Sequence, residues 1–165
     1  MTVARHQLMK YLAVTLLFAI AMGMRLEAIN GTAIDDDLRA DAGFYYLYAL
    51  HLKYHHVFSG APFDSTRIPK PDAVRSPGYP LFLTPFVTVP PTDLMVWKIQ
   101  FAQALLGSLT VLVMLAVFHR LMPAGWAFAA ALLLAISPHL IMISVYLLSE
   151  PLFILFWLSS VTRFR

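Results

Sequence analysis

The chain has 165 residues, of which 59% are hydrophobic and only 13% are charged, and its mean hydropathy is +0.70. Because a soluble domain carries about 25% charged residues, this composition excludes an ordinary soluble protein and indicates a membrane protein. The formal net charge is +3, yet seven of the nine acids fall within residues 30–93, so the charge follows membrane topology and argues against a nucleic-acid partner.

Four apolar segments are candidates for membrane spans, since crossing the hydrocarbon core takes about 20 apolar residues. They are residues 8–29, 96–118, 121–137 and 148–165. We therefore expect an all-α integral membrane protein, a multi-pass helical bundle with a large extracytoplasmic loop, residues 30–93, that carries interfacial helices.

The first segment has an alternative interpretation as a cleaved signal peptide, because Arg5 and Lys10 precede a short apolar run. Residues 22–27 offer no convincing small-x-small cleavage site, which favours a retained span.

The last two segments are interrupted by proline. Pro138 and Pro151 bracket the stretch "HLIMISVYLLSE", and proline breaks the hydrogen-bond ladder of a helix. We expect two short spans joined by a broken or partly re-entrant segment; a single kinked span followed by a truncated one is the alternative.

Basic residues set the expected orientation. Arg5, Lys10, Arg120, Arg163 and Arg165 all fall on one side of these spans, whereas the connection between Ser137 and Pro151 has no lysine or arginine. The positive side is the cytoplasmic one. The N-terminus is thus expected in the cytoplasm and the acidic loop outside it, at the inner (plasma) membrane of a bacterium.

The outer loop has two textures. Residues 42–56 are rich in tyrosine and leucine and predict a helix lying in the membrane interface, where tyrosine is favoured. Residues 61–91 contain 8 of the 11 prolines and predict an ordered but irregular loop, with "SPGYPLF" at residues 76–82 as a compact turn.

The acids of this loop are the first candidates for chemistry. Asp41 directly precedes the aromatic segment, so it is placed either as a helix N-cap or as a general base or metal ligand at the membrane surface. Asp35, Asp36 and Asp37 are read either as a solvated acidic turn or as a field that attracts a cation.

Two further charged residues are candidates for binding. Arg75, on a loop stiffened by proline, suits a phosphate through charge-assisted bonds; a surface or lipid-headgroup arginine is the alternative. Glu150, in "SEP", is expected at the outer membrane face, with either a functional or an N-cap-like role.

Other polar residues carry weaker signals. His51 and His55 are four residues apart and share a helical face, but without a third ligand they favour a polar stripe over a metal site. Arg25 and Glu27 cannot share a helix face and are read as marking the outer end of the first span. There is no cysteine to ligate a metal.

The order of several short motifs resembles the start of GT-C fold glycosyltransferases, in particular the protein mannosyltransferase and aminoarabinose transferase group. These motifs are "DAGFYYLYA" at residues 41–49, "RSPGYPLFL" at 75–83, "SP" at 137–138 and "SEPLF" at 149–153. In that family an acid is followed four positions later by tyrosine, as Asp41 is by Tyr45, and a basic residue precedes a proline turn, as Arg75 precedes Tyr79.

The resemblance implies an enzyme that transfers a sugar from a polyprenyl-phosphate donor to a lipid, glycan or protein acceptor at the outer membrane face. It implies Asp41 as the catalytic carboxylate, with Arg75, Tyr45, Tyr79 and Glu150 binding substrate. A cofactor is not defined, although a divalent cation is a candidate. Family members are several times longer, so the chain is expected to be an N-terminal fragment and inactive in isolation. The alternative is a non-enzymatic polytopic protein, either an assembly partner or a transporter piece.

Overall fold

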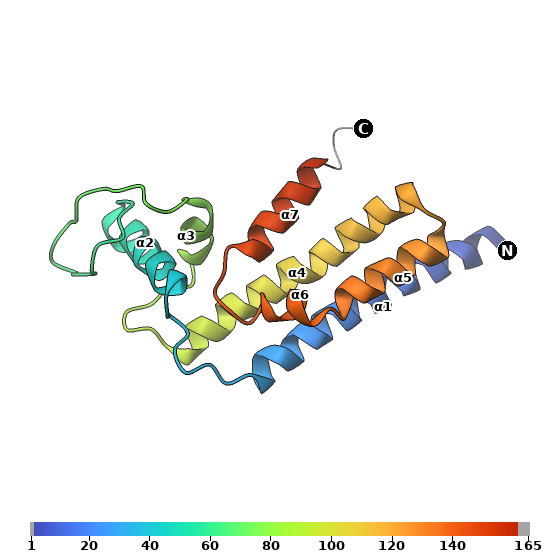
Figure 1. The fold of residues 1–165 in the computed structure, drawn as a ribbon, viewed down its shortest axis with the longest axis horizontal. Helices are drawn as coiled ribbons and strands as arrows, with labels where there is room; N and C mark the ends of the chain where they lie inside the picture. Colours follow the sequence, from blue (N-terminus) through green and yellow to red (C-terminus); the bar gives the residue numbers. More distant parts are fainter. Residues whose placement is uncertain (1, 162–165) are drawn as a thin grey trace. The chain divides into compact units, whose positions relative to one another are not determined.

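The computed structural model describes residues 2–161, which form seven helices and no strand (Figure 1). The helices are α1 (Thr2–Gly31), α2 (Asp41–His55), α3 (Gly78–Leu83), α4 (Asp93–Leu121), α5 (Ala124–Ala135), α6 (Pro138–Met142) and α7 (Glu150–Val161). The expected all-α fold class is therefore confirmed for this part of the chain.

The chain divides into two compact units. The first, called here the helical unit, comprises Met1–Thr32, Phe101–Val145 and Glu150–Arg165. The second, called the loop unit, comprises Ala33–Gln100 and Tyr146–Ser149.

The core of the helical unit lies between three helices. Alanines spaced four residues apart place small side chains along one face of α5, and this face packs on α1, beside which it lies in Figure 1. Small residues at such a contact let helix backbones approach closely. The fully enclosed residues are Leu17 and Ala21 of α1, Val111 and Leu115 of α4, and Ala127, Ala131 and Ala135 of α5.

In the part of the chain that the structure describes, two helices are long and apolar enough to cross a membrane, namely Gln7–Gly31 within α1 and Asp93–Leu121, which is α4. They contain the predicted spans 8–29 and 96–118. The helices α5 and α7 are apolar but have only 12 residues each. At about 1.5 Å per residue they reach about 18 Å, short of a hydrocarbon core of about 30 Å.

The predicted interruption around Pro138 is present. The helix α5 ends at Ala135, α6 starts at Pro138 and has five residues, and α7 begins only at Glu150. The predicted segments 121–137 and 148–165 thus correspond to α5 and α7, and the end of the second, with Arg163 and Arg165, lies outside the described residues.

The helix α2 of the loop unit is more enclosed than the sequence suggested. It was expected to present tyrosines to a membrane interface, but Tyr46 and Tyr48 are buried and their hydroxyls donate hydrogen bonds to other residues of the protein. Phe44 and Tyr54 are the aromatic side chains of α2 that are exposed. The physical reason is that the proline-rich loop supplies carbonyl and carboxylate acceptors that a sequence pattern cannot locate.

Side-chain bonds tie this loop to α2. Tyr46 donates to the Thr88 carbonyl at 2.6 Å, and Lys53 donates to the neighbouring Val87 carbonyl at 2.6 Å. Residues 61–77 and 84–92 are irregular, as predicted, but the expected turn in "SPGYPLF" is instead the short helix α3, which packs on α2.

Candidate functional site

An ion pair between Asp41 and Arg75 is the centre of the candidate site in the loop unit. Arg75 Nη2 lies 2.5 Å from Asp41 Oδ1, although the two residues are 34 positions apart in the chain. Asp41 is 54% exposed and Arg75 is 32% exposed, so the carboxylate is open to solvent while the guanidinium is partly covered. The structure therefore brings together the two residues that the sequence proposed as base and phosphate binder.

The backbone before Asp41 explains how its carboxylate is presented. Ala40 has a positive φ of 55°, which is strained for a residue with a Cβ, and α2 begins at the next residue. The chain then folds back so closely that a Cβ at Gly43 would clash with the carbonyl oxygen of Leu38. Glycine is required there because it has no Cβ.

The prediction that Asp41 caps α2 is wrong. Ala40 occupies the N-cap position and no side chain bonds to the free N–H groups there, while Asp41 is the first residue of the helix. Its negative charge still suits the helix N-terminus, but its oxygen Oδ1 accepts from Arg75. The charged donor competes successfully for this oxygen because charge-assisted bonds are stronger than neutral ones.

Aromatic rings form a wall beside the ion pair. The guanidinium of Arg75 lies 5.3 Å from the Phe44 ring centre and 6.0 Å from that of Tyr45, distances at which a cation is attracted to a ring face. Tyr45 in turn meets Tyr79 edge to face at 5.0 Å between ring centres. Three of the predicted substrate-binding residues, Arg75, Tyr45 and Tyr79, are thus adjacent, and Tyr79 is itself buried.

A carboxylate three residues before Arg75 ties this part of the loop to α2 and to the segment that follows it. Asp72 accepts from the Tyr48 hydroxyl, from the Gly60 N–H at 2.8 Å and from the Ser59 hydroxyl at 3.2 Å. The bond from Tyr48, followed by that from Gly60, lowers the pKa of Asp72, because these donors favour the ionised form. Burial and the same partner raise the pKa of Tyr48.

The same unit contains a pocket of about 480 Å³, which is lined mainly by residues that precede Asp41 in the sequence. Its polar lining comes from the segment before α2 and its apolar wall from Tyr146, Leu147 and Leu148. The charged residues that line it are Asp35, Asp36, Asp37, Arg39 and Asp41.

One acid of this pocket is electrostatically distinct. Burial raises the pKa of Asp37, and the negative charges of Asp93 and Asp36 raise it further. Asp37 therefore takes up a proton at a higher pH than an ordinary aspartate. Within residues 2–161, no three His, Asp or Glu side chains are arranged to hold a metal ion.

The remaining predicted residues are not part of this cluster. Glu150 is the exposed first residue of α7 and belongs to the helical unit. His51 and His55 contact each other through their Nδ1 atoms at 3.0 Å, and His51 Nε2 lies 3.0 Å from the Ala61 carbonyl. Because a carbonyl only accepts, His51 Nε2 is the donor of the bond to Ala61. These bonds make the pair a structural link.

Sequence reasoning missed two features of the site. It did not connect Asp72 with Tyr48, which are 24 positions apart. It also read Tyr146 and Leu147 as part of a broken or re-entrant connection and Leu148 as the start of a span, and did not expect them to line a pocket. The proline density of residues 61–91 was the only signal that this loop would be ordered enough to hold a carboxylate in place.

Comparisons with models of protein families, with curated proteins and with solved structures find no match to this chain. Function is therefore inferred from the side chains of the site rather than from relatives.

Proposed function

We propose that the chain forms the acceptor-activating and phosphate-binding part of a membrane glycosyltransferase that uses a polyprenyl-phosphate sugar at the extracytoplasmic membrane face. The observation that carries this proposal is the Asp41–Arg75 pair, in which an exposed carboxylate and a partly covered guanidinium are held 2.5 Å apart. Glycosyl transfer from a lipid phosphate needs a base for the acceptor and a cation for the leaving group.

In the proposed reaction, the oxygen of an acceptor hydroxyl attacks the anomeric carbon of the donor sugar. Asp41 takes the proton from that hydroxyl. The bond between that carbon and the phosphate oxygen breaks, the electron pair leaves with the lipid phosphate, and the configuration is inverted. Arg75 stabilises the phosphate anion. Asp41 can play this part because only its Oδ1 atom is bonded to Arg75 in the described structure.

Two further observations support a sugar-phosphate ligand. Nε of Arg75 has no hydrogen-bond partner within residues 2–161, so the bond to Asp41 does not use the whole donor capacity of the guanidinium. The pocket of about 480 Å³ next to Asp41 is large enough for a sugar-sized group and is lined by carboxylates, which accept from hydroxyls. The same carboxylates would attract a divalent cation.

The proposed topology has four membrane segments, with α5 and α7 as short or broken spans and the N-terminus in the cytoplasm. This arrangement puts the loop unit outside the cytoplasm, where a lipid-linked donor and a lipid, glycan or protein acceptor meet. The side chains Phe44 and Tyr54, which are exposed on α2, are suited to a membrane interface.

Sugar transfer by membranes that contain the product of the complete reading frame tests the proposal, with a panel of radiolabelled polyprenyl-phosphate sugars as donors. Asp41→Asn is expected to lower turnover by about a hundredfold or more, the usual contribution of a general base. Asp64→Asn is the matched control, because Asp64 bonds only to its own turn at Thr66.

Normal transfer by the Asp41→Asn variant would remove this residue from the chemistry. No transfer by the unmodified protein with any donor would favour the non-enzymatic alternative, an assembly partner or a transporter piece.

A further inference from the structure

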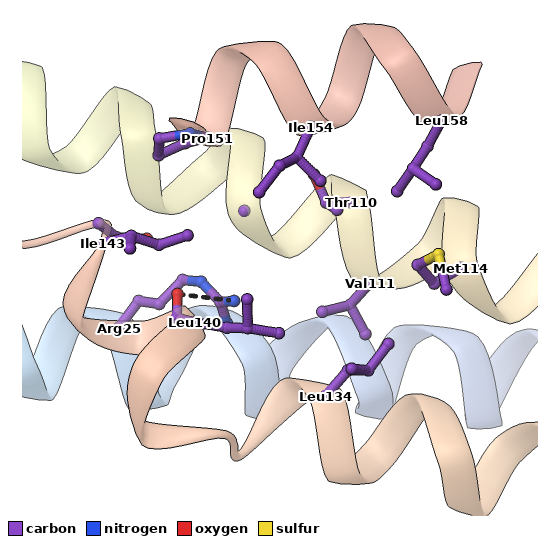
Figure 2. Close-up of a pocket in the computed structure, with 12 residues that line it drawn as sticks. Arg25, Thr110, Val111, Met114, Leu134, Leu140, Ile143, Pro151, Ile154 and Leu158 are labelled. Carbon is purple, nitrogen blue, oxygen red and sulfur yellow. Dashed lines mark hydrogen bonds between the residues drawn. The ribbon is translucent and has the colours of Figure 1, made fainter. Parts of the chain in front are cut away.

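Arg25 is a buried cation without a counter-charge. It lies in α1 and is 2% exposed, and no carboxylate pairs with it in residues 2–161. Its Nη1 atom donates to the Ala21 carbonyl at 2.9 Å and its Nη2 atom to the Leu140 carbonyl at 3.5 Å, the bond drawn in Figure 2. Nε is buried and has no partner. An arginine remains protonated in proteins, so these carbonyls leave a positive charge uncompensated.

A second unpartnered polar atom lies near the first. The Ser144 hydroxyl oxygen is buried and bonds to no atom of the described residues. The point where a Cβ on Gly107 would be lies 2.7 Å from Arg25 Nε and 3.2 Å from Ser144 Oγ. Both atoms therefore border one small space at the bare face of Gly107, which Arg25 Nε itself partly occupies because residue 107 has no side chain.

This space belongs to a cavity of about 200 Å³ inside the helical unit. For scale, an engineered cavity of about 150 Å³ accepts benzene. Figure 2 shows Arg25 at one end of the lining and Leu134, Ile154 and Leu158 farther along it. Apart from Arg25, Ser144 and Thr110, the side chains that line the cavity are apolar.

Charge and shape together define the ligand. A water molecule would satisfy the two free donors but would leave the positive charge uncompensated, whereas a phosphate oxygen does both. The apolar remainder of the cavity does not favour a fully hydrated ion and does favour a hydrocarbon chain. An ionisable residue within a membrane span is also a candidate for function by default.

We propose that Arg25, Ser144 and the open face of Gly107 bind the phosphate headgroup of an anionic membrane lipid, whose acyl chain lies along Leu134, Ile154 and Leu158. The guanidinium Nε and the Ser144 hydroxyl donate to the phosphate oxygens. This site uses none of the residues of the Asp41–Arg75 pair and does not depend on the glycosyl transfer proposed above.

Native mass spectrometry of the full chain in detergent tests the site with three probes: dioleoyl phosphatidic acid, dioleoyl phosphatidylcholine and inorganic phosphate. The unmodified protein is expected to retain phosphatidic acid in preference to phosphatidylcholine. Arg25→Gln is expected to weaken retention of phosphatidic acid about tenfold or more, through loss of charge-assisted bonds.

Two variants that keep Arg25 test whether a loss of lipid retention could come from misfolding instead of from the site. Gly107→Ala places a Cβ that would lie 2.7 Å from Arg25 Nε, so the guanidinium has to move, and Ser144→Ala removes one donor. Both should weaken retention of phosphatidic acid while helix content, followed by circular dichroism, is unchanged. Arg67→Gln and Gly125→Ala are the matched controls, since Arg67 is exposed and a Cβ at Gly125 meets nothing within 4 Å.

Three results would overturn the proposal. The first is equal retention of phosphatidic acid by the unmodified protein and by the Gly107→Ala and Ser144→Ala variants. The second is equal retention of phosphatidic acid and phosphatidylcholine by the unmodified protein. The third is binding of inorganic phosphate that depends on Arg25 without retention of the lipid, which would assign the site to a soluble anion.

Discussion

The loop unit and the helical unit treat their buried polar groups differently. In the loop unit, the buried side chains Tyr46, Tyr48 and His51 each have a hydrogen-bond partner within the same unit, and the exception is the Nε atom of the half-buried Arg75 at the candidate site. In the helical unit, Arg25 and Ser144 are equally enclosed but each retains a polar atom without a partner. Since buried polar groups are nearly always bonded, the first pattern explains a folded loop and the second points to a ligand.

The two units also differ in what stabilises them. The helical unit has an apolar core between α1, α4 and α5 with alanine at the closest contacts. The loop unit is held by side-chain bonds from α2 to a chain segment without regular structure. Changes in packing should therefore affect the first unit, and changes in charge or backbone conformation should affect the second.

Leu17→Ala is expected to have the largest effect on stability. Leu17 is fully buried in the helical core, and truncation of such a residue costs about 2–5 kcal/mol. Thermal unfolding in detergent should show the loss, and hydrogen exchange should increase in α1 and α5 with α2 unchanged. Leu16→Ala is the control, because Leu16 is exposed in the protein. Equal losses in both variants would argue against this core.

Gly43→Ala is expected to destabilise the loop unit by about 1–3 kcal/mol, because the added methyl group overlaps a backbone carbonyl that cannot rotate away. Hydrogen exchange should increase in α2 and leave α1 and α5 unchanged. The control is Gly78→Ala, where the new Cβ meets nothing within 4 Å. Faster exchange in the helical unit instead would contradict the division into two units.

Arg75→Lys sharpens the assignment of the candidate site to the loop unit. An ammonium keeps the charge but loses the planar fork and its stacking over Phe44, so kcat/KM for sugar transfer should fall about tenfold. Arg67→Lys should leave transfer unchanged. A normal kcat/KM in the Arg75→Lys variant would mean that charge alone is sufficient at this position.

Lowering the pH should destabilise the loop unit, and this effect should be smaller than those of the three substitutions above. The pKa of Asp72 is lowered in the folded protein, so its bonds stabilise the fold above the unfolded pKa of about 4, and this stabilisation is lost as pH falls through the folded pKa. Hydrogen exchange in α2, corrected for the intrinsic rate, should rise at low pH. Asp72→Asn should remove this pH dependence, and a variant that keeps it would assign the effect to another acid.

Several features followed from local sequence alone. The apolar runs indicated α1 and α4, Pro138 located the break after α5, and the aromatic segment after Asp41 indicated α2. The candidate base and phosphate binder were also proposed from residue type and order. Their adjacency was not predictable from local pattern, because it depends on a loop of more than 30 residues returning to the start of α2.

Sequence by itself determined the all-helical fold and the two long apolar helices within the described residues, since hydrophobic length and proline position act within a few residues along the backbone. Tertiary structure decided the roles of individual polar residues. For Asp41 the sequence left open a helix cap or a functional carboxylate, and the structure shows an ion-pair partner because Arg75 reaches it. Arg25 was read as a marker of the end of a span and is a buried cation, because α6 and Gly107 enclose it. The charge state and availability of a polar group depend on its neighbours in space, and those are set only when the chain has folded.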